Sequence, residues 1–204
     1  ETEMRRIVLV RHGETVGESK IRFHGSMDVE LADSGKAQMR AARARLDGER
    51  FDLVVASPLK RAWRSAWVVA GGAPVQLETG FREIHFGRWE GLTREEIKAT
   101  DPILFEDWEK RAAGFEYPNG EKRAAFEARV HGALQRVLAR SENSALLVVH
   151  KGVIRTIVEK LTGSKLDLDQ PQLGGVVEIT RDAGGNWFLG KNSSNPKGLD
   201  EAAA

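Results

Sequence analysis

Three short apolar runs in this sequence each end in residues that suit chemistry on an anion. The first runs into Arg11-His12-Gly13, the second into Ser57 with Arg61 close behind it, and the third into His150. In an open parallel sheet, ligands bind beyond the carboxyl ends of the strands. Two histidines and two arginines that are distant in sequence are therefore expected to meet on one rim.

These residue types suit a phosphate group. Arginine presents a planar fork of donors that matches phosphate oxygens. Gly13 lets backbone amides approach an anion closely, and a helix that starts after His150 adds partial positive charge. The sequence contains no G-x-x-x-x-G-K-[ST] loop, so a phosphate clamp made of side chains is predicted instead of a nucleotide-binding loop.

Each residue also has a structural interpretation. A lone histidine at a strand end is more often a hydrogen-bonding residue than a nucleophile. Arg61 alone would be a surface arginine at a helix start, and His150 alone a core histidine. The convergence of three strand ends, more than any single residue, favours the phosphate interpretation.

The elements that must position these residues alternate along the chain. Nearly continuous apolar runs at 6–10, 51–56 and 145–149 are typical of strands buried on both faces. Helical patterns follow at 33–46, 57–70, 126–138 and 153–161, with Ser57-Pro58 as a candidate cap and Gly163 as a candidate stop. Runs at 176–180 and 187–189 flank a turn and predict a hairpin. The alternation predicts an α/β fold, a three-layer α/β/α sandwich with a mostly parallel central sheet.

The remaining segments complete one predicted domain. Residues 78–118 contain short helical patterns and prolines but no clear core strand, so we interpret them as an excursion over the top of the sheet. We expect a single domain over 1–190 and a polar, mobile tail over 191–204.

Composition excludes several classes of protein. With 31 basic and 30 acidic residues in 204, a net charge of +1 gives no support for nucleic-acid binding. The absence of cysteine excludes disulfides, thiolate metal sites and a cysteine nucleophile. No apolar run approaches the roughly 20 residues that span a bilayer, and the first six residues lack the pattern of a signal peptide. We expect a cytoplasmic protein without a membrane partner.

Four ordered blocks resemble the histidine phosphatase superfamily, also called the phosphoglycerate mutase-like family. The first is Arg11-His12-Gly13-Glu14-Thr15, continued through Gly25 and Asp28; the others are Ser57-Pro58-Leu59-x-Arg61-Ala62, Arg82-Glu83-Ile84-x-Phe86-Gly87-x-Trp89-Glu90-Gly91-Leu92, and Val148-Val149-His150-x-Gly152. Together they cover the chain from about 6 to 165 in the order and spacing of the family. The resemblance implies the same fold and a phosphatase activity.

The resemblance also implies roles for individual residues. His12 would attack phosphorus and carry the phosphoryl group, which requires an unprotonated ring nitrogen. Arg11, Arg61 and His150 would clamp the transferring oxygens. Glu83 matches the proton donor of the family and would later help to activate water. The cationic clamp replaces a metal ion, so neither a metal nor another cofactor is expected.

Three features depart from the common pattern or bear on the pocket rim. Glu18 stands where relatives have an asparagine, after Gly17 in place of a tryptophan, which hints at different substrate contacts; Arg22 or Lys20 is available to offset its charge. Lys151 replaces a glycine and either reaches a second anionic group or points to solvent. The His24-Gly25 pair is expected at the rim.

Alternative functions remain open from the sequence. A phosphoglycerate mutase would retain the phosphoenzyme, whereas the short chain between Arg61 and Glu83 and the polar tail favour hydrolysis of a small phosphorylated metabolite. A phosphate-binding module without catalysis would be expected to lack the nucleophile or the acid, yet both are present. A phosphoprotein phosphatase would share the same motifs. The sequence identifies neither the substrate nor whether the protein is a monomer or a homodimer.

Overall fold

The structure is a computed structural model that describes residues 3–190, and its core is one six-stranded sheet. The strand order across the sheet is β3-β2-β4-β1-β5-β6. The strands are β1 (Arg6–Arg11), β2 (Leu53–Ala56), β3 (Gln76–Leu77), β4 (Ser144–Val149), β5 (Val176–Arg181) and β6 (Trp187–Leu189). The pairings of β1 with β4, β2 with β4 and β2 with β3 are parallel, and those of β5 with β1 and β6 are antiparallel.

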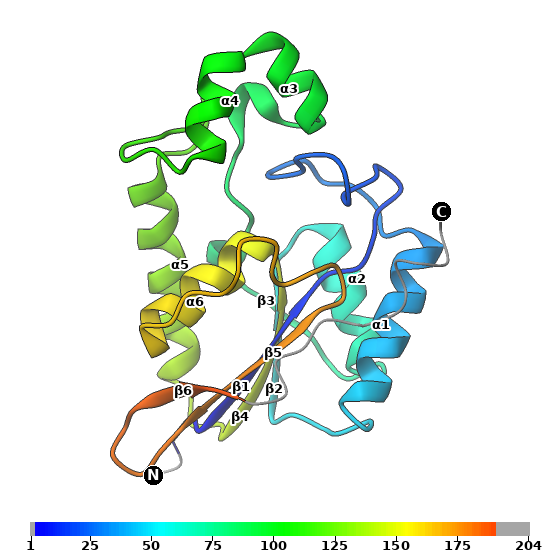
Figure 1. The fold of residues 1–204 in the computed structure, drawn as a ribbon. Helices are drawn as coiled ribbons and strands as arrows, with labels where there is room; N and C mark the ends of the chain where they lie inside the picture. Colours follow the sequence, from blue (N-terminus) through cyan, green and yellow to red (C-terminus); the bar gives the residue numbers. More distant parts are fainter. Residues whose placement is uncertain (1–2, 191–204) are drawn as a thin grey trace.

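Helices cover both faces of the sheet, as Figure 1 shows. One side carries α1 (Asp33–Arg45) and α2 (Lys60–Val69), and the other carries α5 (Arg123–Leu138) and α6 (Lys151–Thr162). The predicted three-layer α/β/α sandwich with a mostly parallel sheet is confirmed. The predicted hairpin is also confirmed as β5 and β6, and Gly163 ends α6 in the left-handed conformation with φ of 70°.

Side chains along the central strands point alternately to the two covered faces of the sheet, which explains the continuous apolar runs in the sequence. Ile7 and Leu9 of β1 belong to the core cluster beneath α5 and α6, whereas Val8 and Val10 belong to the cluster beneath α1 and α2. Successive side chains of a strand point to opposite faces, so a strand covered on both faces needs an apolar residue at every position. All four of these side chains have no exposed surface.

The excursion predicted over 78–118 crosses the carboxyl-end edge of the sheet. It contains the short 3₁₀ turns η1 (Thr79–Phe81) and η2 (Gly87–Trp89) and the helices α3 (Arg94–Thr100) and α4 (Pro102–Glu109). Figure 1 shows α3 and α4 standing beyond the sheet, at one end of the molecule. Trp89 anchors the segment, since it is fully buried and packs edge-on against Phe23, Trp108 and Tyr117.

Two details differ from the sequence-based expectation. The strand β3 was missed because it has only two residues, both exposed, which leave no apolar pattern. The helix α2 begins at Lys60, not at Ser57-Pro58, and its first amide donates to Asp28 Oδ1 at 2.8 Å. A side chain from a distant loop therefore accepts the first helix amide, while Ser57 Oγ accepts the amide of Leu59 at 3.3 Å, just before the helix. The tail predicted over 191–204 lies outside the described residues.

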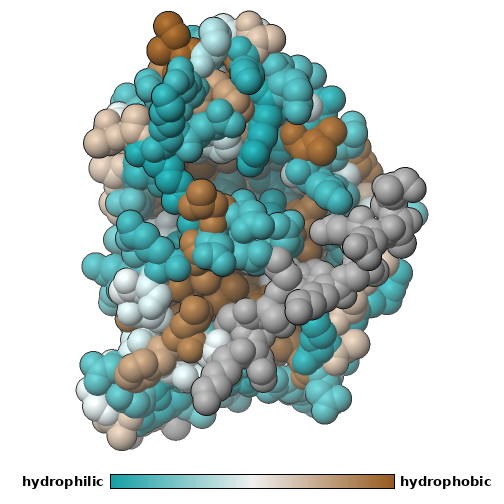
Figure 2. All heavy atoms as spheres, in the orientation of Figure 1, coloured by the Kyte–Doolittle hydropathy of each residue, from teal (hydrophilic) through white to brown (hydrophobic). Residues whose placement is uncertain are grey.

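Among residues 3–190, no helix is long and apolar enough to cross a membrane. The face of the molecule in Figure 2 is mostly hydrophilic, and its hydrophobic residues form small separate groups.

Candidate active site

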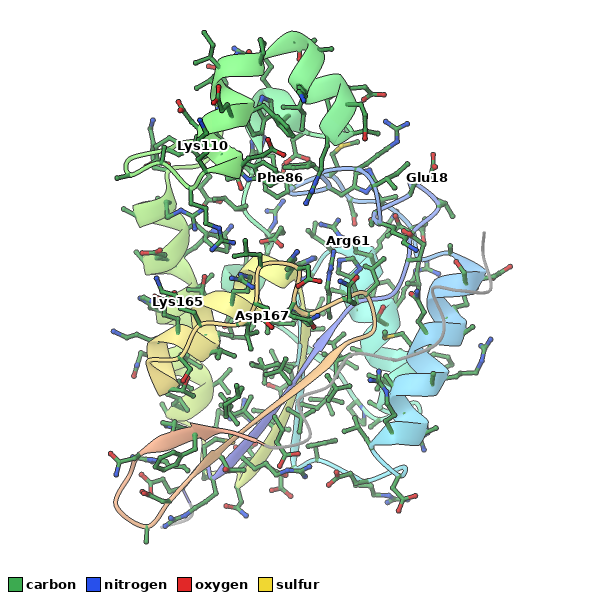
Figure 3. All side chains as sticks on the ribbon, in the orientation of Figure 1. Glu18, Arg61, Phe86, Lys110, Lys165 and Asp167 are labelled. Carbon is green, nitrogen blue, oxygen red and sulfur yellow. The ribbon has the colours of Figure 1, made fainter. Side chains whose placement is uncertain are left out.

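The strand order places the three predicted strand ends side by side. Parallel pairing sets Arg11 opposite Val149 and Ala56 opposite Val148, so β1, β4 and β2 end at the same level. The rings of His12 and His150, which directly follow β1 and β4, have centroids 5.2 Å apart. Figure 3 shows Arg61 at this edge of the sheet. The predicted meeting of two histidines and two arginines is thus what the topology produces.

The ring of His12 is held in one tautomer. Its Nδ1 lies 2.8 Å from the carbonyl oxygen of Gly13, which can only accept a hydrogen bond. Nδ1 therefore carries the hydrogen, and in the neutral ring Nε2 has a free lone pair. Burial lowers the pKa of His12 well below its usual value, and the charges of Arg61 and Arg11 lower it further. The neutral ring is the stable form at neutral pH.

Arg61 is completely buried and fixed by a neighbouring loop. Its terminal nitrogens donate to the carbonyl oxygens of His24, Gly25 and Met27 at 2.9, 2.7 and 2.6 Å. Burial lowers its pKa to about 10, so the side chain remains a cation at neutral pH. Its Nε is buried and has no hydrogen-bond partner.

Arg11 and His150 are also fixed by a hydrogen bond, and each has one buried nitrogen without a hydrogen-bond partner. Arg11 donates to the carbonyl of Pro171 at 2.9 Å, while its Nε is buried without a partner. His150 Nε2 lies 2.8 Å from Ser57 Oγ, and its Nδ1 is buried without a partner. The pKa of His150 is well below its usual value because of burial and the nearby cations.

Three of these orphaned atoms define the character of the site. Across residues 3–190, only four buried side-chain polar atoms lack a hydrogen-bond partner, and Arg11 Nε, Arg61 Nε and His150 Nδ1 are three of them. An unpaired buried polar atom costs free energy. The two arginine atoms are donors, and His150 Nδ1 is a donor when it carries the ring hydrogen. Their grouping at three adjacent strand ends favours a ligand that is rich in acceptors, such as an anion.

Glu83 enters from the excursion and is docked on the start of α6. It is 7% exposed, and its Oε2 accepts the amide of Gly152 at 3.0 Å while its Oε1 accepts that of Ile84 at 3.0 Å. Its charge acts on both Arg11 and Arg61, where it opposes the effect of burial on their pKa values. A carboxyl group therefore lies beside the cationic cluster, as predicted.

Gly152 has a steric reason to be glycine. A Cβ at this position would lie 2.5 Å from Glu83 Oε1 and 3.2 Å from its Cδ. The absent side chain is what allows the carboxyl group to approach the helix amide.

The sequence-based interpretation missed two residues that brace the site. Arg129 of α5 donates to the carbonyl oxygens of Gly80, Arg82 and Glu83, and forms a two-pronged pair with Glu121. Nothing in the spacing of the arginine-rich stretch around 123–140 distinguishes Arg129 from its neighbours. Its role depends on chain segments that only folding brings together.

Glu90 is the second brace. It accepts the amides of Gly25, Ser26 and Phe86 at 3.1, 2.8 and 3.0 Å. It thereby ties the loop that holds Arg61 to the excursion that carries Glu83. The motif Trp89-Glu90-Gly91 in the third block was the available signal.

The two predicted glycines lie at the site with structural roles. The amide of Gly13 donates to Ser65 Oγ at 3.1 Å, and its missing side chain makes room for the backbone of Gly35. The expectation that Gly13 lets backbone amides approach an anion stays a prediction. Gly25 presents its carbonyl to Arg61 and packs against Ile84.

Glu18 and His24, both predicted at the pocket rim, have different surroundings in the structure. Glu18 adopts φ of 62°, is 64% exposed and pairs with Arg22 at 3.8 Å; Figure 3 shows it on the outer part of its loop, away from Arg61. His24 is half-buried, and its Nδ1 lies 2.9 Å from Ser19 Oγ. A Cβ on Gly17 would lie 2.7 Å from His24 Cε1, so Gly17 makes room for this ring.

Lys151 opens α6 and is half-buried. Burial and the charge of Arg11 lower its pKa to about 8. It therefore does not simply extend into solvent, which was one of the two sequence-based expectations.

Within the described chain, no group of three or more His, Cys, Asp or Glu side chains is arranged to hold a metal ion.

Comparison with known proteins gives a consistent picture. The family model described as the histidine phosphatase superfamily (branch 1) matches residues 7–193. A glucosyl-3-phosphoglycerate phosphatase of Mycolicibacterium vanbaalenii is 33% identical over 183 residues, which cover 85% of this chain and 80% of the relative. Phosphoserine phosphatase 1 of Hydrogenobacter thermophilus is 31% identical over 166 residues, which cover 80% and 79%. The crystal structure of the alpha-ribazole phosphatase from Shigella flexneri superposes with a TM-score of 0.78 at 26% identity, covering 93% of this chain and 96% of that one.

Proposed function

The chain belongs to the histidine phosphatase superfamily, and from this premise we propose that it hydrolyses phosphomonoesters of small metabolites through a phosphohistidine on His12. The observation that carries the proposal is the set of three buried nitrogens without partners, Arg11 Nε, Arg61 Nε and His150 Nδ1, beside the free lone pair of His12 Nε2. A phosphoryl group would supply acceptors for these donors and an electrophilic centre for the ring nitrogen. Its relatives are phosphatases of this family.

The first half-reaction uses the neutral ring of His12. Nε2 attacks phosphorus, and the bond from phosphorus to the alcohol oxygen breaks. The ring becomes cationic as the nitrogen–phosphorus bond forms, and the carbonyl of Gly13 stabilises that charge through Nδ1. Arg11, Arg61 and His150 hold the three remaining oxygens, where negative charge resides throughout the transfer.

For His150 to donate to phosphate, its Nδ1 must carry the hydrogen. Ser57 Oγ, 2.8 Å from Nε2, then donates to that nitrogen. An anion on the Nδ1 side selects this tautomer, because the alternative would place a lone pair against a negative oxygen. Ser57 is thus proposed as a positioning residue.

Glu83 is proposed as the acid and then the base. In its acid form it protonates the departing alkoxide, and as a carboxylate it takes a proton from the water that attacks the phosphohistidine. Each carboxyl oxygen accepts one backbone amide, which leaves a second lone-pair site on each for the proton. The two half-reactions run in opposite directions, so one residue serves both.

No step in this sequence uses a metal ion or another cofactor, since the two arginines and His150 supply the positive field. We therefore propose that the activity survives exhaustive treatment with EDTA. Inhibition that zinc or magnesium reverses would contradict the mechanism.

The function is tested with a panel of phosphomonoesters in EDTA, with interconversion of 3- and 2-phosphoglycerate followed in the same samples. Phosphate release by the wild type and its loss in His12→Ala, at unchanged thermal stability, is the expected result. Interconversion without release would make the protein a mutase. An active His12→Ala variant would refute the assignment of the nucleophile.

A further inference from the structure

Lys151 is a half-buried cation without a partner beside the candidate active site. It directly follows His150 at the first position of α6. Over residues 3–190, its ammonium group forms no hydrogen bond or ion pair. Other lysines of the same chain pair with carboxylates, although they are more exposed: Lys36, Lys60, Lys110 and Lys165. Within the described residues Lys98, Lys122 and Lys160 form no ion pair either, but their side chains are exposed, whereas Lys151 is half-buried.

The surroundings of Lys151 are mainly positive. The charges of Arg11 in β1, Arg155 in α6 and Arg94 in α3 act on it, and the charge of Asp169 opposes them without an ion pair. Burial is the main cause that brings its pKa to about 8, and the arginines add to it. Bringing like charges together on a partly desolvated surface costs free energy unless an anion joins them.

Two of the neighbouring arginines are held in place without being neutralised. Arg155 donates to the backbone carbonyl oxygens of Leu166, Asp167 and Gln170, which are not charged. Figure 3 shows Asp167 on the loop that follows α6. Arg94 lies over the ring of Trp108 at 5.2 Å. Within the described chain neither arginine forms an ion pair with a carboxylate, although the charges of Glu159, Asp167 and Asp169 act on Arg155 from a distance.

We propose that Lys151, with Arg155 and Arg94 behind it, forms a second anionic subsite that binds a carboxylate or a second phosphate on the alcohol part of the substrate. The proposal rests on the function proposed above and narrows it to doubly anionic metabolites. Arg11 contributes to both the phosphate clamp and the surroundings of Lys151. The two anionic groups must therefore be only a few bonds apart.

Matched substrates isolate the second anion. 3-Phosphoglycerate and glycerol 3-phosphate differ by a carboxylate in place of a hydroxymethyl group, and phosphoserine and phosphoethanolamine differ by the presence of a carboxylate. The measured quantity is the ratio of kcat/KM within each pair. 2,3-Bisphosphoglycerate against 3-phosphoglycerate tests a second phosphate in the same way, because its two phosphates are on adjacent carbons. The pair with the largest ratio identifies the anion that the subsite takes.

Variants at Lys151 test whether this lysine causes the difference in kcat/KM within a substrate pair. We expect Lys151→Gln to lower the ratio about tenfold or more, since a hydrogen bond to a charged group is lost. Lys151→Arg should keep most of the ratio because it keeps the charge. Lys160→Gln is the matched control, as it removes an exposed lysine from the same helix, and it should leave the ratio unchanged. A ratio that Lys151→Gln leaves unaltered in every pair overturns the subsite.

The pH dependence gives a second readout. The anion preference of the wild type should fall as pH rises through about 8, because Lys151 loses its proton there. The other charged groups that act on Lys151 are Arg11, Arg155, Arg94 and Asp169, and changes at His12 cancel within a pair. A ratio that is flat from pH 7 to 9 in the wild type contradicts the proposal.

Failure of the proposed function has a different signature. If no substrate releases phosphate, the hydrolase proposal fails, and the subsite is then judged by binding of the same pairs to the wild-type protein by calorimetry. Tighter binding of the doubly anionic member, lost in Lys151→Gln, would support the subsite. Equal binding of both members would refute it.

Discussion

Replacing Gly152 with alanine should separate catalysis from folding. The added Cβ would lie 2.5 Å from Glu83 Oε1. Nonbonded carbon and oxygen atoms keep about 3.3 Å apart, so the carboxyl group must retreat by roughly 0.8 Å. A misplacement of about 1 Å at a reacting group can cost on the order of 100-fold in rate. The displacement affects the group proposed to protonate the leaving alcohol.

The assay compares substrates that differ in their need for an acid. For an alkyl phosphate, kcat/KM of Gly152→Ala should fall about 10- to 100-fold, because the alkoxide must be protonated as it leaves. p-Nitrophenyl phosphate, whose leaving group is stable as an anion, should lose much less. Glu83→Gln should show the same selectivity. Equal losses for both substrates in these variants would refute the acid role of Glu83.

A control glycine makes the experiment sharper. Gly132 lies within α5, and a Cβ there would meet only Arg136 at 3.7 Å, an ordinary contact. Alanine in a helix interior is about 0.5–1 kcal/mol more favourable than glycine, so Gly132→Ala should stabilise the protein and leave kcat/KM unchanged. The free energy of unfolding of Gly152→Ala should lie within about 1 kcal/mol of the wild-type value, because the gain in helix propensity offsets the strain at Glu83. Urea denaturation of both variants checks this, and a collapsed Gly152→Ala would show that the loss of activity has a structural origin.

Three further predictions concern the support and the charge of the site. Arg129→Met removes the hydrogen bond to the carbonyl of Glu83 at 3.0 Å, so it should lower kcat for alkyl phosphates more than for p-nitrophenyl phosphate; loss of stability alone, with no such selectivity, would contradict a positioning role. His12 and His150 are held neutral in the folded protein, whereas in the unfolded chain they bind protons near pH 6.5. The stability that the neutral form supports is therefore present above that pH and is lost as pH falls. The loss is about 1 kcal/mol for each histidine between pH 6.5 and 5.5. Urea titrations at the two pH values test this, and His12→Asn should remove about 1 kcal/mol of the difference; His24, whose pKa burial also lowers, adds to the rest. Inorganic phosphate should raise the melting temperature, since at 100 times its Kd it adds about 2.7 kcal/mol to the free energy of unfolding. Arg61→Met should abolish this effect. If the variant is stabilised by phosphate as much as the wild type, the orphaned nitrogens are not the anion site.

Sequence alone predicted the framework because the framework is local or periodic. Strands buried on both faces need continuous apolar runs, and those at 6–10, 51–56 and 145–149 were found from that property. The rule that ligands bind at the carboxyl ends of parallel strands then predicts that His12 and His150 meet. Their 5.2 Å separation follows from strands β1 and β4 being neighbours.

Tertiary structure decided what holds each group and which atoms remain free. The partner of His12 Nδ1, the three carbonyls around Arg61, and the support of Glu83 by Arg129 and Gly152 join segments many residues apart. Residue type does not reveal such pairings, because a buried donor takes whichever acceptor the folded chain brings within reach. The unpaired state of Lys151 likewise depends on neighbours from other elements. The sequence determined which groups stand at the rim, and packing determined which of their nitrogens remain available to an anion.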